Sequence, residues 1–145
     1  MNRTNVALLL PRHVRVLAVA YFFASLAHFA HNAEYIAFYP NMPAWITRET
    51  VYLTWIGITA AGFLGLFMLR AGFYLADIAL VGVYGALGLY GLAHYALALC
   101  SEHTLAANIT IWLEAGFGFL LMLSSGLLLW RRATFPNALT ERTGG

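Results

Sequence analysis

Three of the five histidines in this chain lie in stretches of sequence that are otherwise apolar: His28, His31 and His94. Two of them share a local sequence, because residues 25–30 read SLAHFA and residues 91–96 read GLAHYA. Glu114 is a carboxylate in a similarly apolar stretch. An ionisable group is costly in hydrocarbon, so its presence inside an apolar segment indicates a functional site.

These four side chains could hold a metal ion. Two histidines at positions i and i+3 of a helix can share one metal, and three imidazoles with one carboxylate suit zinc, copper or iron. Metal ligands need hydrogen-bonding partners of their own. The candidates for that outer shell, or for the entrance of the site, are Ser25, Asn32, Glu34, Tyr90 and His103. The sequence lacks the HExxH motif and the dense histidine boxes that would assign a particular metalloenzyme.

Haem is the weaker alternative to a metal ion. A transmembrane bundle can hold a haem between two axial imidazoles on facing helices. Gly91, one turn before His94, would leave room for the macrocycle. However, the basic side chains that suit haem propionates are scarce near these histidines.

The elements that must position these residues are four apolar segments. Of the 145 residues, 61% are hydrophobic and only 10% are charged, too little polar surface for a soluble globule of this size. Each segment approaches or exceeds the roughly 20 residues that a hydrocarbon core requires. We therefore predict an all-α, integral membrane four-helix bundle of up-down-up-down topology, a single transmembrane domain over residues 1–145. The predicted helices cover about 14–38, 51–69, 73–99 and 106–130, with an interfacial arm at 1–12 and a solvated tail at 131–145.

The arginines predict the orientation of this bundle in the cell membrane. All eight basic residues are arginine, and seven of them fall near the N-terminus, in the turn at Arg70 or near the C-terminus. Only Arg48 lies in the other two loops. The positive-inside rule then places both termini in the cytoplasm, as expected for an inner-membrane protein. This distribution favours the lipid bilayer as a partner and offers no case for nucleic acid.

Helical periodicity predicts which face of the first helix turns inward. Its polar residues recur at spacings of four and three, and they are Tyr21, Ser25, His28, Asn32 and Tyr35. In lipid, such a stripe faces the interior of the bundle. Counted from the arginines, His28 and Glu114 lie at similar depth, 16 and 17 residues away from Arg12 and Arg131. His94 is 24 residues from Arg70, which places it nearer the outer surface, level with His31 or Glu34.

Two further patterns concern the packing of the helices. The shared histidine sequence suggests two repeated helix pairs, 14–70 and 73–130, in which each second helix carries a tryptophan near its outer end. Small residues punctuate the third helix at Gly82, Gly85, Gly88 and Gly91. Small residues allow helices to approach closely, within one bundle or between protomers. A cofactor lying against this glycine face is the alternative.

Three functions are compatible with these observations. The first is a metal-binding or cofactor-binding membrane protein, either an enzyme acting on a lipophilic substrate or an electron carrier, with its histidine cluster in the outer half of the bundle. The second is an accessory or structural subunit of a membrane complex, in which the polar cluster only staples the helices together. The third is a small proton-linked transporter or a protein that binds a lipophilic ligand. A bundle of four helices favours a homo-oligomer or a larger complex in each case.

Overall fold

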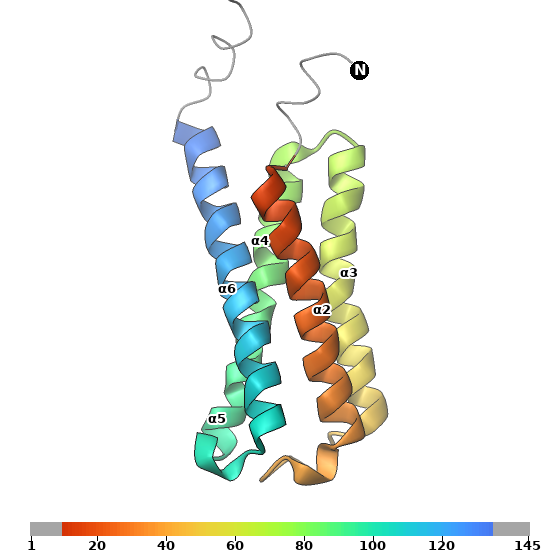
Figure 1. Ribbon diagram of the computed structural model, residues 1–145. Helices are drawn as coiled ribbons and strands as arrows, with labels where there is room; N and C mark the ends of the chain where they lie inside the picture. The colour runs from red at the N-terminus through yellow and green to blue at the C-terminus, as the bar shows by residue number, and fades with distance from the viewer. Residues whose placement is uncertain (1–9, 135–145) are drawn as a thin grey trace, which may run out of the picture.

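The computed structural model describes residues 10–134, and every regular element in them is helical. The elements are α2 (Arg12–Glu34), η1 (Ile36–Phe38), α3 (Arg48–Arg70), α4 (Tyr74–Leu87), η2 (Gly88–Ala93), α5 (His94–Leu97), η3 (Cys100–Glu102) and α6 (Leu105–Thr134). Together they make four long helical rods, because α4, η2 and α5 follow one another without a break (Figure 1). All four rods are long and apolar enough to cross a membrane, as the sequence predicts.

The boundaries differ from the predicted ones where the backbone changes its hydrogen bonding. The first helix ends at Glu34 because Tyr35 leaves the helical region, and a 3₁₀ turn follows. The last helix continues past residue 130 to Thr134, with Arg131 and Arg132 in its final turn, where cations interact favourably with the helix dipole. The parts of the predicted arm and tail at 1–9 and 135–145 lie outside the described residues.

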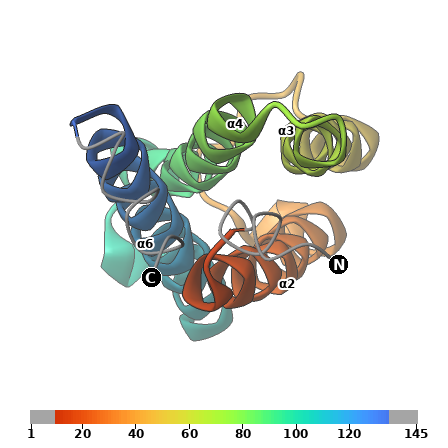
Figure 2. The same cartoon turned by 90° about the horizontal axis from the view of Figure 1, so that it is seen from above.

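The four rods surround a common axis. Helix α2 packs against α3 and α6, and α4 packs against the same two helices, so α2 and α4 stand on opposite corners (Figure 2). The start of α2, the turn at 71–73 and the end of α6 lie at one end of the bundle, which we call the arginine end. The segments 35–47 and 98–104 lie at the other, which we call the histidine end.

Glycines bring α4 and α6 into close contact. A Cβ atom on Gly118 would lie 2.5 Å from the carbonyl oxygen of Gly85, and one on Gly88 would lie 2.5 Å from Cε2 of Tyr21. No side chain fits at these positions, so the two backbones and the Tyr21 ring occupy the space. Packing within the bundle therefore accounts for Gly85 and Gly88.

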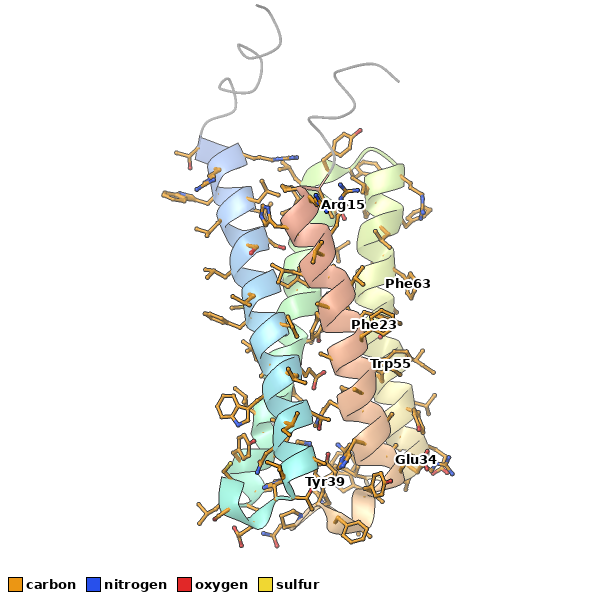
Figure 3. All side chains as sticks on the ribbon, viewed as in Figure 1. Arg15, Phe23, Glu34, Tyr39, Trp55 and Phe63 are labelled. Atoms are coloured by element: carbon orange, nitrogen blue, oxygen red, sulfur yellow. The ribbon has the colours of Figure 1, made fainter. Side chains whose placement is uncertain are left out.

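The outer surface of the bundle is strongly apolar. Large hydrophobic side chains are exposed on every long helix, among them Phe23, Phe63, Val83 and Trp112. Figure 3 shows Phe63 pointing away from the bundle. The buried interior also holds many polar side chains, including Ser25, His28, Thr59, Asp77, Glu114 and Ser125. The apolar surface therefore surrounds an interior in which apolar and polar side chains are mixed.

The segment 35–47 closes the histidine end. Asn41 adopts a left-handed conformation, with φ of 57°, and its Nδ2 donates a hydrogen bond of 2.8 Å to the carbonyl oxygen of Leu97. Thr47 caps the start of α3 by accepting from the backbone N–H of Thr50, and the Thr50 hydroxyl accepts from the N–H of Thr47. These contacts tie the segment to α5 and α3, and they direct Tyr39 into the bundle.

Candidate functional site

The candidate site begins with the buried stripe of α2. Tyr21, Ser25, His28 and Asn32 are buried, whereas Tyr35 lies at the end of the helix and is exposed. The inward orientation predicted from the sequence is therefore confirmed for four of the five residues. The most buried ionisable pair joins this stripe to α6: His28 Nε2 lies 3.6 Å from Glu114 Oε2, and the two side chains are 2% and 1% exposed.

The hydrogen bonds around His28 define its tautomer. The Thr110 hydroxyl donates to the carbonyl oxygen of Ala107 at 2.9 Å. Its only hydrogen is thereby used, so Thr110 Oγ1 accepts from Nδ1–H of His28, at 3.3 Å. Neutral His28 then carries a lone pair on Nε2, facing Glu114. A lone pair and a carboxylate repel each other in a buried contact, so the pair carries one proton, on His28 or on Glu114.

Gly91 makes room for this pair. A Cβ atom at Gly91 would lie 3.0 Å from Glu114 Oε2 and 3.8 Å from His28 Nε2. The space next to this glycine, which the sequence suggested for a macrocycle, is thus occupied by the carboxyl group of Glu114. Ser25 lies next to the same carboxyl group on its other side.

The side chain of His94 contacts both Asn32 and His28. The two ring centroids are 5.3 Å apart, and His94 Nε2 accepts a hydrogen bond of 3.3 Å from Asn32 Nδ2. The hydrogen bond to Asn32, the residue after His31, agrees with the depth that the count from Arg70 predicts, and the ring of His94 extends from there to His28. The two histidines of the shared local sequence therefore meet.

Tyr39 is the residue of the site that sequence reasoning missed. It is 4% exposed, its ring centroid lies 4.9 Å from that of His94, and its hydroxyl is 2.9 Å from His31 Nδ1. Burial raises the pKa of Tyr39 to about 12, so the hydroxyl keeps its proton at neutral pH. The sequence marks Tyr39 only as one of several interfacial aromatics, and no periodicity reveals the direction of a side chain between helices.

The remaining predicted residues divide into neighbours of the site and residues outside it. His103 is buried, and its Nδ1 donates to the carbonyl oxygen of Leu99 at 3.0 Å, with its ring 6.1 Å from that of His94. His31 contacts Tyr39 and Tyr35 rather than the pair of His28 and Glu114. Glu34 is exposed and binds Arg48 at 2.7 Å and the hydroxyl of Tyr52 at 2.7 Å, so it clamps α2 to α3.

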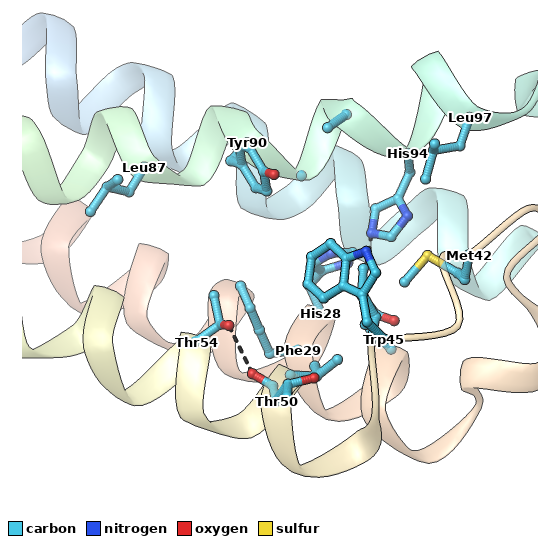
Figure 4. Close-up of a pocket in the computed structure, with 15 residues that line it drawn as sticks. His28, Phe29, Met42, Trp45, Thr50, Thr54, Leu87, Tyr90, His94 and Leu97 are labelled. Atoms are coloured by element: carbon cyan, nitrogen blue, oxygen red, sulfur yellow. Dashed lines mark hydrogen bonds between the residues drawn. The ribbon is translucent and has the colours of Figure 1, made fainter.

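A cavity of about 230 Å³ opens beside His28 and His94. His28, Asn32 and His94 line one end of the cavity, and Thr50 and Thr54 of α3 line another part of it, where Figure 4 shows them away from His94. The two threonine hydroxyls donate to backbone carbonyl oxygens, of Thr47 and Thr50, and apolar residues form most of the remaining lining. The apolar lining consists of Phe29, Met42, Trp45, Ile46, Val51, Leu87, Ala93 and Leu97. Tyr90 and Trp45 line the cavity and are about three-quarters exposed, at 75% and 74%, so they stand at its mouth.

Within residues 10–134, no group of three or more His, Cys, Asp or Glu side chains is arranged to hold a metal ion. The ring nitrogens have other partners, since Nδ1 of His28 bonds Thr110, Nε2 of His94 bonds Asn32, and Nδ1 of His31 bonds Tyr39. The observed arrangement is a hydrogen-bonded polar cluster next to a cavity. The metal ion and the haem stay predictions of the sequence.

Comparison with other proteins adds no family to this picture, since no protein-family model, curated protein or solved structure matches the chain. The site must be interpreted from its own geometry.

Proposed function

We propose that the chain is a membrane-embedded protein that binds a small amphiphile in the cavity at its histidine end. Four helices of membrane-spanning length and an apolar outer surface support insertion as an up-down-up-down bundle. Arg12, Arg15, Arg70, Arg131 and Arg132 belong to the arginine end. By the positive-inside rule that end faces the cytoplasm, with both termini, and the cavity opens in the outer half of the cell membrane.

The single observation that carries this proposal is the group of His28, Asn32 and His94 at one end of a mainly apolar cavity, in which the Thr50 and Thr54 hydroxyls already donate to the backbone. Sites for small molecules are typically apolar concavities with a few convergent polar groups that fix the orientation of the ligand. At about 230 Å³ the cavity is smaller than the roughly 300–1,000 Å³ of pockets for drug-sized ligands. It therefore suits a small molecule, or the head group of a longer lipid.

The polar end requires a head group that both donates and accepts hydrogen bonds. Asn32 Nδ2 donates to His94 Nε2, which leaves the proton of a neutral His94 on Nδ1. Asn32 Oδ1 is buried and has no hydrogen-bond partner among the described residues. The pair thus has two further donors, Nδ1–H of His94 and the second N–H of Asn32, and one acceptor, and reversing the amide and the tautomer together preserves that count. Hydroxyl, carboxylic acid and amide groups match it.

A quenching titration tests the proposal. The purified protein in nanodiscs is titrated with 4-bromophenol, whose bromine quenches tryptophan fluorescence, and with 4-bromoanisole, which lacks the hydroxyl proton. We expect saturable quenching by the phenol that disappears in Trp45→Phe, and an affinity for the anisole at least about tenfold lower, as one lost buried hydrogen bond implies. Equal affinity for both probes, or full quenching in Trp45→Phe, would refute the proposal.

Asn32→Leu provides the matched variant, because leucine keeps the approximate volume and removes both polar atoms. We expect it to weaken binding of the phenol and to leave binding of the anisole nearly unchanged. Asn108→Leu is the control, since Asn108 bonds Tyr95 and the carbonyl oxygen of Cys100 and does not line the cavity.

A metal site remains the second candidate, favoured by the proximity of His28, His94 and Glu114. Elemental analysis of the protein purified without chelators tests it, and a stoichiometric transition metal that is lost in His28→Ala would support it. A Soret band in the absorption spectrum would indicate bound haem.

The accessory-subunit and homo-oligomer predictions are tested by gentle solubilisation followed by mass measurement of the intact particle.

A further inference from the structure

The interior of the bundle contains buried polar side chains that the cavity does not use. Their hydroxyl or carboxyl oxygens are inaccessible and have no hydrogen-bond partner among the described residues. We call these seven residues the polar ladder: Tyr21, Ser25, Thr59, Asp77, Tyr84, Glu114 and Ser125. A buried polar group left without a partner costs about 1–3 kcal/mol, so a set of seven in one small bundle requires an explanation.

The ladder extends along the bundle rather than forming one cluster. At about 1.5 Å of rise per residue, Tyr21 and Ser25 are about 6 Å apart along α2, Asp77 and Tyr84 about 10 Å apart along α4, and Glu114 and Ser125 about 16 Å apart along α6. All four long helices contribute, with Thr59 from α3 close to the level of Tyr84. The ladder therefore covers most of the length of the bundle.

Five of the seven members of the ladder form a series of neighbours. Glu114 lies next to Ser25, and Ser25 next to Tyr21. The rings of Tyr21 and Tyr84 contact each other edge to face, with centroids 4.5 Å apart, and the Tyr84 hydroxyl adjoins Thr59. A buried water needs two to four polar partners, and the unpartnered oxygens of these neighbours would supply them.

One apolar layer interrupts the ladder. Ile78 and Val81 are buried between Asp77 and Tyr84 on α4, in the apolar cluster that also contains Val14 and Leu121. Beyond this layer, Asp77 lies against α3, where a Cβ on Gly65 would be 3.4 Å from its Oδ1, and it interacts electrostatically with Arg132. A hydrophobic constriction of this kind can act as a gate, because it blocks passage while it is dry and permits passage when water fills it.

We propose that the chain carries protons along this ladder, between the pair of His28 and Glu114 and the carboxyl group of Asp77. The pair already carries one exchangeable proton. Each hydroxyl or water takes a proton from the group before it and passes its own to the next, so only O–H and N–H bonds break and form and no net charge stays behind. The apolar layer conducts when water bridges it. Chains of ionisable and hydroxyl groups serve this role in membrane proteins.

Proteoliposomes with a trapped pH-sensitive dye test this proposal. A potassium gradient with valinomycin sets the membrane potential, and the initial rate of internal acidification is measured. We expect the wild type to exceed protein-free liposomes, and Glu114→Gln and Asp77→Asn to lower the protein-dependent rate by at least about tenfold, because each variant removes a proton acceptor from the path. Val81→Thr, which places a hydroxyl in the apolar layer at nearly constant volume, is expected to raise the rate.

Ser125→Ala and Ser124→Ala form the matched pair. The two serines are adjacent on α6, but Ser125 is fully buried and unpartnered whereas Ser124 is partly exposed and is not part of the ladder. We expect only Ser125→Ala to slow acidification. The two serine variants still test the proposal if circular dichroism and gel filtration show that Glu114→Gln does not fold.

Two results would overturn the proposal: wild-type acidification no faster than in protein-free liposomes, or an unchanged rate in Asp77→Asn. The proposal does not rest on the amphiphile, since Asp77 lies at the opposite end from the cavity. Binding of 4-bromophenol is accordingly expected to be the same in Asp77→Asn as in the wild type, so each proposal can fail without the other.

Discussion

Replacement of Gly118 by alanine should weaken the fold at the crossing of α4 and α6. The added Cβ would lie 2.5 Å from the carbonyl oxygen of Gly85, whereas ordinary contact begins at 3.4 Å. The obstacle is backbone, so no side-chain rotation relieves it, and the two helices must separate by roughly 1 Å. The Tyr21 ring, 3.3 Å from the same Cβ position, would lose part of its packing as well.

The expected change in the free energy of unfolding of Gly118→Ala combines two opposing contributions. Overpacking of a well-packed interior costs about 1–3 kcal/mol. Alanine recovers up to about 1 kcal/mol of helix propensity relative to glycine. We therefore expect Gly118→Ala to lower the free energy of unfolding by about 1–2 kcal/mol.

Gly116 supplies the matched control on the same helix. A Cβ there would meet nothing within 4 Å, so Gly116→Ala keeps the gain in propensity without the clash. Both variants are unfolded reversibly in mixed micelles with increasing sodium dodecyl sulfate, and helicity is followed by circular dichroism. The difference between the variants isolates the clash. If Gly118→Ala is as stable as Gly116→Ala, the backbones of α4 and α6 do not approach each other as closely as the structure places them at Gly85 and Gly118.

Three further predictions follow from other contacts. Tyr39→Phe should lower the free energy of unfolding by about 1 kcal/mol through loss of its hydrogen bond to His31, measured in the same micelles. Because burial raises the pKa of Tyr39 from 10.0 to about 12, the folded state keeps this proton longer than the unfolded state, so wild-type stability should fall as pH rises from about 10 to about 12. That part of the fall should be missing in Tyr39→Phe, and an identical pH profile for the two proteins would contradict it. Arg48→Met should change stability by less than about 1 kcal/mol, because its ion pair with Glu34 is largely exposed; a larger loss would show a buried role for the pair. Cys100 is exposed at the histidine end and should react with a membrane-impermeant maleimide added outside intact cells, whereas labelling only after lysis would reverse the proposed orientation.

Local patterns in the sequence were sufficient to predict the four long helices and the face of α2 that is buried. Hydrophobic length predicts four segments that could span a membrane, and the structure has four such helices. The spacing of Ser25, His28 and Asn32 predicts one buried face, and all three residues are buried. These features depend on the rise and rotation of a single helix, which are the same in every helix.

The composition of the candidate site depended on how the helices meet. His94 reaches His28 and Asn32 because turn length, tilt and the 3₁₀ segment Gly88–Ala93 set its height, and none of these is periodic in the sequence. Tyr39 enters the site from a segment between helices, and His31 turns away from Glu114 to contact it. Counting residues along separate helices cannot fix such distances, since a small change of tilt moves a side chain by several ångströms over the length of a helix.

The sequence by itself thus determined that polar groups would lie inside an apolar four-helix bundle, because their cost in hydrocarbon leaves them no other place. Only the tertiary structure decided which of them touch. It set His28 Nε2 3.6 Å from Glu114 Oε2, opened a cavity beside His94, and buried unpartnered hydroxyls from all four long helices inside the bundle. The physical reason is that burial is a property of one helix face, whereas a site is a set of distances between faces.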